Sequence, residues 1–558
     1  MIFNFNSIKN TLEGIPFVSK IYDLKAEDIT VNGNIQIDFE ELPDPLDFEI
    51  IIAAHYPLRS YDSESIKFKN KSLIQYQHVM GDGSICIHTS HNTNLEQKLL
   101  MDLKSLKNWI LRYYINNEND THYEHIIVPE NTINESYYSF SYTNVDHKFK
   151  KGDYGTVGIC SLSNGIYREK PIYNNIVRHF SINHNHKVNC EWSSRYLNMS
   201  LINTGVYIFV KNHPAKMNRF IFQEWEDFTD LFPDDFLAFL HRFESDNIKK
   251  FKGQITPVFI GYDTIEKEIH WQIALIEIGN YPMKGVPIRI NGQKTGKWKS
   301  QLTAGSINWA ISRDSSYHYF FGRGALTSNI TEKKILIIGI GAIGSMIAKT
   351  FVRGGCKKID LADFDVKEPE NVCRSEYLFN LGLNDKVDEL SRILTAISPF
   401  VETSTVNKDY FQTIVKLFYK EKSYRKTFIS ELNKYDIIVD CTTDDDLMYI
   451  LDKLSVGCTI ISMSITNKAK ELVAGFHPNS YRFFKTQYYD ILENDLDDLY
   501  NPTGCWSPTF KASYNEINYL VQFAVKHINL LFAENRQKSN FVIKSKEKDA
   551  INYCVEEY

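Results

Sequence analysis

Hydrophobic positions in the C-terminal part of the chain form short apolar runs that alternate with segments of helical periodicity. Apolar residues spaced three or four apart predict helices at 343–352 and 513–532, and continuous apolar runs predict strands at 334–338, 358–362 and 436–439. Strands that alternate with helices favour a parallel sheet. We therefore expect residues 317–558 to form a doubly wound, mostly parallel α/β domain.

The N-terminal part has a mixed pattern. Apolar runs at 48–53 and 73–76 predict strands, and helical spacing predicts a helix at 95–114, with helices on both sides of Asn116. We expect residues 1–144 to form one α+β domain.

Residues 145–316 contain repeated apolar runs separated by segments rich in Gly, Asn and Pro. They predict strands at 205–210, 258–262 and 271–278 and one helix at 234–243, and thus a β-rich α+β middle domain. No chemistry is recognisable in it, so spacer and target-recognition roles both stay open. Four tryptophans either fill its core, which we favour, or form a protein-docking surface: Trp225, Trp271, Trp298 and Trp309.

Composition adds limits on function. The 558 residues are 43% hydrophobic, enough for several cores, and the formal charge of −6 gives no reason to expect nucleic-acid or membrane binding. We find no long apolar run and no signal-peptide pattern at Met1. The nine cysteines include no C-x-x-C pair, which argues against a structural zinc site and suits a reducing cytoplasm. We expect a cytoplasmic protein.

A glycine-rich turn follows the predicted strand at 334–338. Gly339, Gly341 and Gly344 form a G-x-G-x-x-G pattern that leads into the predicted helix at 343–352. Glycines let backbone N–H groups approach a polyphosphate, and a helix N-terminus favours negative charge. By itself, this turn would indicate a nicotinamide dinucleotide first.

The residues after this turn favour ATP instead. The second strand ends at Asp363 and Asp365, where a carboxylate can hold ribose hydroxyls. Asn371, Arg374 and Lys386 then supply polar and cationic groups that suit a triphosphate and that hydride transfer does not need.

Carboxylates also follow the third predicted strand. Asp440 and Asp444 flank Cys441-Thr442-Thr443 at the C-terminal end of that strand. Oxygen ligands in such a place suit magnesium.

The order of these motifs resembles the ThiF/MoeB and ubiquitin-activating superfamily over roughly residues 319–558. Members adenylate the C-terminal carboxylate of a protein with ATP and release pyrophosphate. The resemblance implies that Asp363, with Asp365 beside it, binds ribose and that the phosphates are held by three residues: Asn371, Arg374 and Lys386. Arg323, in Phe-Gly-Arg-Gly, resembles an arginine before the glycine turn that can act across a dimer. We therefore expect a homodimer formed through the C-terminal domain.

One position departs from this resemblance. Relatives usually have D-C-T-D, whereas this chain has a second threonine, Thr443, after Thr442. The expected magnesium ligand is therefore Asp444, shifted by one residue, or Asp440, and we favour Asp444.

Cys505 lies in the turn-rich segment 501–510, directly before the predicted helix at 513–532. A helix N-terminus favours a thiolate. The segment resembles the crossover-loop cysteine of bacterial ubiquitin-activating-like enzymes, which implies that Cys505 takes up the activated carboxyl as a thioester. A loop thiol without this role is the alternative. Cys356, Cys441 and Cys458 lie in or beside apolar runs and are expected in the core.

Cys86 follows an Asp-Gly-Ser turn at 82–84 and precedes the predicted helix at 95–114. This arrangement resembles the active-site segment of ubiquitin-conjugating enzymes, where a D-G-x-x-C-L element follows an H-P-N motif. Cys86 matches the conjugating cysteine. A buried cysteine without catalytic function is the alternative.

The H-P-N motif itself is absent, and His78 stands in the register of its asparagine. A histidine can donate a hydrogen bond to an oxyanion or accept a proton, and His78 can also be a structural residue only. His88 and His91 lie near Cys86 and receive no role beyond local polarity.

The two ends together resemble the activating–conjugating fusion enzymes of bacterial CBASS antiphage systems, which link the C-terminus of a cyclic-oligonucleotide synthase to other molecules through an amide bond. The resemblance implies adenylation with ATP and Mg²⁺, capture by Cys505, transfer to Cys86 and aminolysis by an amine. Its implied partners are a protein with a free C-terminal carboxylate and an acceptor amine.

Three rival interpretations remain. The C-terminal domain could adenylate a ubiquitin-like or sulfur-carrier protein that the N-terminal half merely recruits. A nucleotide-binding interaction protein without catalysis is the second, and the series Asn371, Arg374 and Lys386 argues against it. A nicotinamide oxidoreductase is the third and fits least well.

Overall fold

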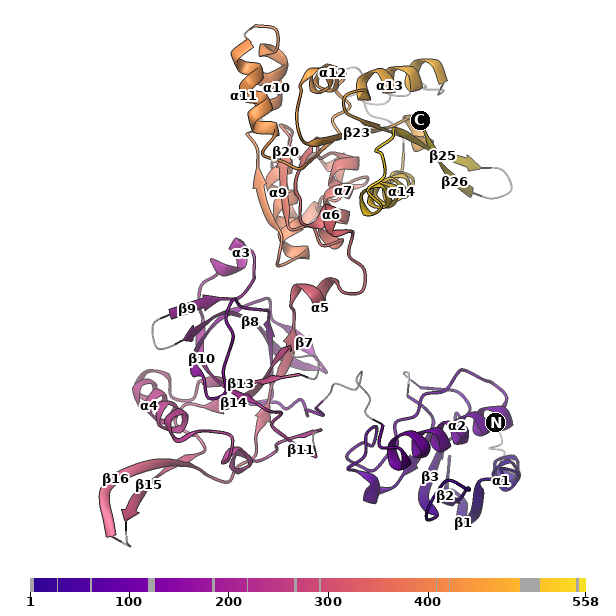
Figure 1. Cartoon of the computed structure of the whole chain (residues 1–558), viewed down its shortest axis with the longest axis vertical. Coiled ribbons are helices and arrows are strands. Elements are labelled where there is room, and N and C mark those ends of the chain that lie inside the picture. The colour runs from indigo at the N-terminus through magenta and orange to yellow at the C-terminus, as the bar shows by residue number, and fades with distance from the viewer. Residues whose placement is uncertain are drawn as a thin grey trace.

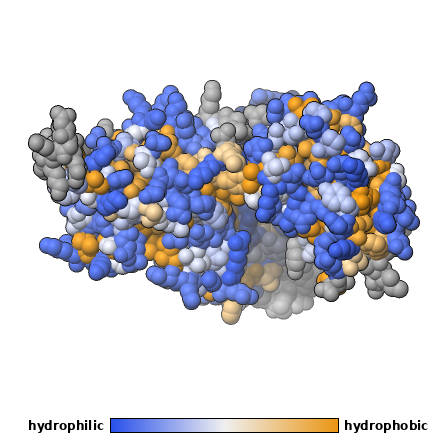
Figure 2. All heavy atoms as spheres, turned by 90° about the horizontal axis from the view of Figure 1, so that it is seen from below, coloured by the Kyte–Doolittle hydropathy of each residue, from blue (hydrophilic) through white to orange (hydrophobic). Residues whose placement is uncertain are grey.

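The computed structural model describes residues 5–27, 29–60, 63–118, 126–182, 186–217, 219–264, 268–290, 293–407, 409–420, 422–491, 512–547 and 551–558. Figure 1 shows three bodies: an N-terminal domain in indigo, a middle domain in purple to pink, and a C-terminal domain in orange to yellow. The middle domain adjoins both others. In Figure 2 hydrophilic atoms predominate on the face formed by the N-terminal and middle domains, and hydrophobic atoms form small groups.

The N-terminal domain packs two helices against one face of an antiparallel sheet whose strand order is β1-β2-β3-β4. Alternate residues of β2 and β3 are buried, and they meet Leu99, Leu103 and Leu106 of the long helix in one hydrophobic cluster. Its elements are α1 (Phe5–Glu13), β1 (Val18–Glu27), β2 (Thr30–Ile37), β3 (Leu46–Ala53), β4 (Ile66–Lys69), η1 (Lys71–Leu73), α2 (Leu95–Trp109) and η2 (Ile110–Ile115).

Two elements predicted for this part are wrong. The expected strand at 73–76 is absent because the Asn70 side chain accepts a hydrogen bond from Ser72 N–H, which caps the 3₁₀ turn η1. The helix expected after Asn116 is also absent from residues 117–118 and 126–136, the described part of that stretch. Residues 126–130 instead run extended beside the middle domain, where Ile127 bridges to Phe220.

The middle domain is built on a ten-stranded sheet in the order β17-β14-β13-β10-β6-β8-β5-β18, with β7 and β9 paired to β8. β17 and β18 belong to one short segment, and they pair with β14 and β5, so the two ends of the sheet meet and it closes. β5 is thus a strand of this sheet although the sequence pattern grouped it with the N-terminal domain.

The elements of the middle domain are β5 (Tyr137–Tyr142), β6 (Tyr154–Ser161), β7 (Gly165–Tyr167), β8 (Lys170–Ile182), β9 (His186–Asn189), α3 (Ser194–Leu197), β10 (Asn203–Lys211), β11 (Ala215–Lys216), β12 (Phe220–Ile221), η3 (Trp225–Phe228), α4 (Asp234–Phe251), β13 (Ile255–Asp263), β14 (Ile269–Glu277), β15 (Met283–Ile290), β16 (Gln293–Leu302), β17 (Asn308–Trp309) and β18 (Ile311–Asp314). Trp225, Trp271 and Trp309 are buried in its cores, as favoured above. Trp298 is 65% exposed on β16, which pairs only with β15 among the described strands.

The C-terminal domain has an eight-stranded sheet in the order β21-β20-β19-β22-β23-β24-β25-β26. Strands β21 to β23 are parallel and the last three run antiparallel, which confirms the mostly parallel prediction. Alternate residues of β19 face opposite sides: Ile335 and Ile337 pack with α7 and α14, whereas Leu336 and Ile338 pack with α10 to α12.

The elements of this domain are α5 (Tyr317–Phe321), α6 (Ser328–Thr331), β19 (Lys334–Ile338), α7 (Ala342–Arg353), β20 (Lys358–Ala362), α8 (Pro369–Val372), η4 (Phe379–Leu381), α9 (Lys386–Ile397), β21 (Glu402–Thr405), α10 (Tyr410–Leu417), α11 (Lys422–Leu432), β22 (Ile437–Asp440), α12 (Asp445–Lys453), β23 (Thr459–Ile465), η5 (Asn467–Ala469), β24 (Glu471–Phe476), α13 (Ser480–Thr486), η6 (Gln487–Ile491), α14 (Tyr514–Ala533), β25 (Phe541–Glu547) and β26 (Ile551–Glu557). None of the described helices has the length and apolar composition needed to cross a bilayer.

The middle domain contacts the C-terminal domain around α3. Ser193 N–H donates to Pro399 O over 2.8 Å, and the Tyr196 hydroxyl donates to Thr395 O over 3.0 Å. The rings of Trp192 and Phe400 lie 5.6 Å apart. Polar and aromatic contacts therefore join these two domains.

Candidate functional site

The glycine turn between β19 and α7 is shaped by close backbone approaches. Gly339 has a φ of +74°, and a Cβ there would lie 2.8 Å from Thr442 N. A Cβ on Gly344 would lie 2.1 Å from Gly339 O. A Cβ on Gly341, in contrast, would meet no atom of the described chain within 4 Å. The turn is thus packed on its inner side and open at Gly341, where a phosphate could approach backbone N–H groups.

Two side chains fix Ile340 at the centre of this turn. Asp363 Oδ2 accepts a hydrogen bond from Ile340 N–H over 2.8 Å, and the Tyr377 hydroxyl donates to Ile340 O over 2.6 Å. The other oxygen of Asp363 accepts from Asp365 N–H. Asp363 therefore lies beside the glycine turn, as a ribose ligand would, and also holds the turn in place.

Lys386 points toward the same edge of the sheet. It begins α9, its Nζ lies 2.5 Å from Asp365 Oδ2, and its side chain is 8% exposed whereas that of Asp365 is 57% exposed. Because a buried ammonium needs a counter-charge, Asp365 holds Lys386 in position. The Lys386 ammonium is therefore already in position to bind a phosphate at this edge.

Asn371 and Arg374 lie on the connection between β20 and α9. The Asn371 side chain accepts a hydrogen bond from Glu368 N–H over 2.9 Å, within the capping box of α8. Arg374 follows α8, is half-buried, and its N–H donates to Asn371 O. The predicted phosphate ligands are therefore held by a short, capped turn of helix.

The two candidate magnesium ligands differ in their surroundings. Asp440 is 1% exposed, and its oxygens accept hydrogen bonds from Thr442 and Ser462. Burial raises the pKa of Asp440 above its ordinary value. Asp444 is half-buried and caps α12, accepting from Asp446 N–H and Leu447 N–H through one oxygen. Its second oxygen accepts no hydrogen bond from a described residue.

Thr443 turns the chain directly before α12. Thr443 has a φ of +56°, a left-handed conformation that turns the chain before α12 begins. Asp444, the residue after Thr443, is the cap of α12.

No contact in the described part of the chain places Arg323 or Cys505 at the glycine turn. Arg323 is exposed after α5, and its side chain makes no hydrogen bond or ion pair with any described residue. Cys505 lies outside the described residues. In the described chain after the segment of Cys505, the Tyr514 hydroxyl donates to Glu376 Oε1 over 2.7 Å.

Three cysteines of this domain lie in or against its hydrophobic cores, as expected. Cys356 is buried, and Cys441 and Cys458 pack against the hydrophobic clusters on the two faces of the sheet. Burial raises the pKa of Cys441 well above its ordinary value. A thiol with a raised pKa is a poor nucleophile at neutral pH.

Cys86 lies in the irregular segment between η1 and α2. The preceding turn is closed by Ser84, whose N–H donates to Asp82 Oδ1 over 3.0 Å, and Gly83 has a φ of +85°. The Cys86 thiol is half-buried, and burial raises its pKa. The thiol is therefore accessible, which leaves the predicted role physically possible.

The segment with His78 lies next to Cys86. Cys86 N–H donates to His78 O over 2.7 Å, and His78 has a left-handed φ of +59°. Its ring lies 4.7 Å from that of Tyr113. His78 thus touches the Cys86 segment through its backbone and packs its ring on η2.

Comparison with known proteins found one matching family model and several partial relatives. Residues 315–483 match the ThiF family model. An ATP-dependent ubiquitin transferase-like protein, Cap2 of Enterobacter hormaechei subsp. hoffmannii, is 26% identical over 272 residues, or 47% of this chain and 43% of that protein. Ubiquitin-like modifier-activating enzyme 5 of Caenorhabditis elegans is 29% identical over 20% of this chain and 26% of its own length. The alignments thus span less than half of these relatives.

Among solved structures, E. coli MccB with ATP aligns over 41% of this chain and 64% of MccB at 14% identity, with a TM-score of 0.28. That overall likeness is too low to support an argument. The ThiF match covers β19 to α13, and therefore the glycine turn and the residues that surround it.

The sequence analysis did not identify several residues that hold the glycine turn or form buried ion pairs. Tyr377 is one, and the buried ion pair between Lys367 and Glu389, 2.7 Å apart, is another. Lys98 and Asp102 form a third case: they are buried on α2, four residues apart, on the face that carries Leu99 and Leu103. Charged residues on an apolar helix face were the available signal for this pair.

The middle domain reaches the His78 segment through Arg219. Its side chain is 5% exposed and donates to two backbone oxygens, Tyr76 O and Val79 O. Gln77 O accepts from the Trp109 indole and His78 O from Cys86 N–H, so all four carbonyls from 76 to 79 are bonded. This segment therefore depends on another domain.

We expect Arg219→Ala to loosen the Cys86 segment. Loss of hydrogen bonds to a charged donor should raise amide exchange at residues 76–86 by about 10- to 100-fold, the equivalent of about 1.5–3 kcal/mol. Hydrogen exchange with mass spectrometry measures this. Arg242→Ala, at an exposed position of α4, is the matched control, and equal exchange in both variants would contradict the expectation.

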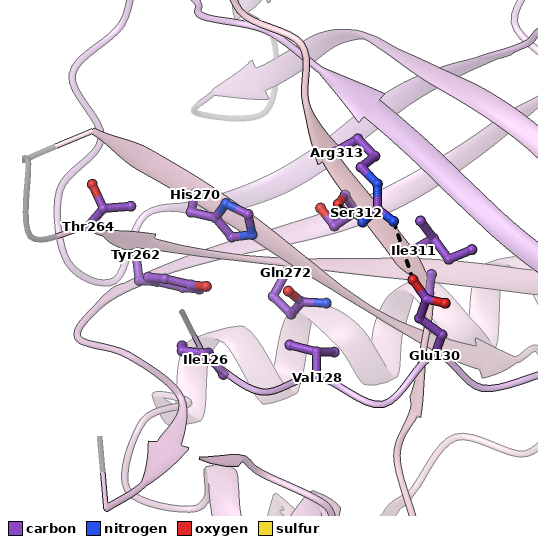
Figure 3. A pocket seen from close by; sticks show the side chains of 11 residues that line it. Ile126, Val128, Glu130, Tyr262, Thr264, His270, Gln272, Ile311, Ser312 and Arg313 are labelled. Atoms are coloured by element: carbon purple, nitrogen blue, oxygen red, sulfur yellow. Dashed lines mark hydrogen bonds and ion pairs between the residues drawn. The ribbon is translucent and has the colours of Figure 1, made fainter. Parts of the chain in front are cut away.

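A pocket of about 280 Å³ lies in the middle domain (Figure 3). Tyr262, His270 and Gln272 form one wall, and Glu130 pairs with Arg313 at 3.3 Å at one end. None of the predicted site residues lines it, so the pocket is separate from the candidate site.

Proposed function

We propose that the protein uses ATP to adenylate the C-terminal carboxylate of a protein substrate. The observation that carries this proposal is that the open glycine turn, the Asp363 carboxylate and the buried Lys386 ammonium gather at the C-terminal edge of the parallel strands. Ligands of such sheets bind at this edge. The ThiF match over the same residues supports the proposal.

The chemistry follows from charge. A carboxylate is a poor electrophile, and attack of its oxygen on the α-phosphorus of ATP gives an acyl-adenylate and pyrophosphate. Lys386 and Arg374 would stabilise the charge that develops on the phosphates, and Asn371 would orient them. The attacking carboxylate is already ionised at neutral pH, so no protein base is needed for this step.

Magnesium would enter with the nucleotide. Asp444 would hold it through the oxygen that does not cap α12, whereas the oxygens of Asp440 already accept three hydrogen bonds. The described residues contain no group of three or more metal-binding side chains. One carboxylate plus ATP phosphates is a usual way for a protein to bind Mg²⁺, which neutralises phosphate charge.

We further propose that the acyl group passes to Cys505, then to Cys86, and finally to an amine. The substrate would be the C-terminus of a CBASS cyclic-oligonucleotide synthase, in antiphage defence. Support comes from the accessible Cys86 thiol and from the similarity to Cap2, whose name describes an ATP-dependent ubiquitin transferase-like protein. Linking both active sites in one chain raises the effective concentration of donor and acceptor.

A homodimer through the C-terminal domain is part of this proposal. Phe364, Phe379 and Leu383 are exposed around the connection from β20 to α9, with Phe379 79% exposed. Apolar side chains in such numbers favour a protein contact. Arg323 of one protomer would then reach the nucleotide of the other.

The nucleotide preference can be measured directly. We expect ATP with Mg²⁺, at about 100 times its Kd, to stabilise the protein by about 2.7 kcal/mol and raise its melting temperature, whereas NAD should leave it unchanged. ATP–pyrophosphate exchange with a candidate protein substrate then tests adenylation. A shift with NAD alone would contradict the proposal.

A further inference from the structure

His88 lies beside the Cys86 thiol. The distance from Cys86 Sγ to His88 Nε2 is 3.5 Å, within the range of a hydrogen bond to sulfur. Ile85 and Ile87 are buried, so the alternating residues Cys86 and His88 point away from the core on the same side. His88 is exposed and thus reachable by an incoming substrate.

The position of His88 is fixed by the next residue, Thr89. The Thr89 N–H donates to Glu64 Oε1 over 3.2 Å, and Thr89 O accepts from the Arg59 guanidinium. The Thr89 hydroxyl donates to Asp102 Oδ1 and accepts from Lys98 Nζ over 2.7 Å. Every polar group of Thr89 is therefore bonded to a charged side chain.

These charged side chains form a buried cluster of their own. Lys98 and Asp102 are 1% and 0% exposed, and Lys98 Nζ also binds Glu64 Oε2 over 2.9 Å. The Tyr56 hydroxyl donates to Asp102 Oδ2 over 2.9 Å. A buried network with satisfied partners is rigid, so Thr89 has little freedom to move.

We propose that His88 is a catalytic residue of the Cys86 site, where it accepts and returns the proton of the thiol. This inference rests on the proposed function of Cys86 as carrier of the acyl group. Thr89, bound to the buried cluster, is the positioning residue that keeps the imidazole beside the sulfur.

The proton moves as follows. When Cys86 Sγ attacks the incoming thioester carbonyl, its S–C bond forms and the S–H proton passes to His88 Nε2. The S–C bond to the donor sulfur then breaks, and the departing thiolate is protonated by the imidazolium. In the final step an amine nitrogen attacks the Cys86 thioester, its N–C bond forms and the S–C bond breaks. The amine proton passes to His88 Nε2 and then to the released Cys86 thiolate.

Burial of the Cys86 thiol is the reason why proton transfer to His88 would speed the reaction. Because burial raises the pKa of Cys86, little thiolate exists at neutral pH, and a thiolate is the reactive form. The imidazole of His88, 3.5 Å from the sulfur, can accept the proton during the reaction. Other titratable groups on the packed elements are His78, whose backbone bonds to Cys86; Lys69 and Asp82 at the preceding turn; and the cluster Arg59, Glu64, Lys98 and Asp102.

His88→Gln in the full-length protein tests the inference, with His91→Gln as the matched control at a nearby exposed histidine. At pH 7 we expect His88→Gln to slow thioester transfer and aminolysis by about 100-fold. The defect in thioester transfer should shrink as the pH rises, because a growing fraction of the thiol is then ionised without help from the imidazole. At pH 7, alkylation of Cys86 by iodoacetamide, followed by mass spectrometry, should be slower in His88→Gln than in wild type and unchanged in His91→Gln.

The positioning role has a separate test. Thr89→Ser keeps the hydroxyl and should retain the wild-type pH profile, whereas Thr89→Val should behave like His88→Gln. Wild-type rates and alkylation profile in His88→Gln, with Cys86→Ala inactive, overturn the inference but leave the proposed function standing. Full conjugation by Cys86→Ala overturns both, so the two failures are distinguishable.

Discussion

Cys86→Ala should abolish conjugation while leaving adenylation intact. Without the sulfur, the acyl group has no acceptor in the N-terminal domain, so we expect product formation to fall by more than about a thousandfold. ATP–pyrophosphate exchange should stay within about twofold of wild type, since Cys86 belongs to a separate body of the molecule from the glycine turn (Figure 1). Nonreducing gels of protein incubated with ATP and the substrate show the thiol-sensitive adducts on Cys505 and on Cys86.

The proposed transfer of the acyl group from Cys505 to Cys86 also predicts which adducts each variant loses. Cys505→Ala should remove both thiol-sensitive adducts, whereas Cys86→Ala should remove only the one on the N-terminal domain. Cys554→Ala is the matched control, because that cysteine is also partly buried and lies on the terminal strand β26. Normal product formation by Cys86→Ala would favour an enzyme that only adenylates and recruits a carrier protein.

Gly344→Ala should damage both stability and ATP binding. The new Cβ would lie 2.1 Å from Gly339 O, a backbone atom that cannot move without displacing the glycine turn. We expect a loss of about 1–3 kcal/mol in the free energy of unfolding and no stabilisation by ATP with Mg²⁺. Thermal unfolding with and without nucleotide measures the two effects.

Gly341→Ala separates these effects. Its Cβ would meet no described atom within 4 Å, so the melting temperature without nucleotide should match wild type. Because the added methyl group would occupy the open side of the turn, ATP should stabilise this variant less. If Gly344→Ala and Gly341→Ala melt at the same temperature as wild type, our account of the packed turn is wrong.

The C-terminal domain was largely predictable because its sequence signals are local. The strand predicted at 358–362 coincides with β20, and the helix predicted at 343–352 lies within α7. Apolar periodicity specifies such elements wherever strands are buried on both faces. The strand predicted at 73–76 and the helix predicted after Asn116 were wrong, because Asn70 caps a 3₁₀ turn at the first and Ile127 pairs with Phe220 of the middle domain in the second.

The candidate site, too, was predictable from the sequence only in part. The sequence located the glycine turn, Asp363, Lys386 and Cys86, because each stands at a fixed place relative to a strand or a turn. It left the choice between Asp440 and Asp444 open. Only the fold decides burial, and burial distinguishes an aspartate with three hydrogen bonds from one with an available oxygen.

By itself, the sequence determined most strands and helices of the C-terminal domain, its glycine turn, and a cysteine directly after an Asp-Gly-Ser turn, because local spacing and turn chemistry encode them. Tertiary structure alone decided the contacts between distant segments: Tyr377 on the glycine turn, Arg219 on the carbonyls next to His78, and Thr89 in its charged cluster. These contacts join residues that are far apart in the chain. No local pattern specifies such partners, because they arise only when the packed cores bring the segments together.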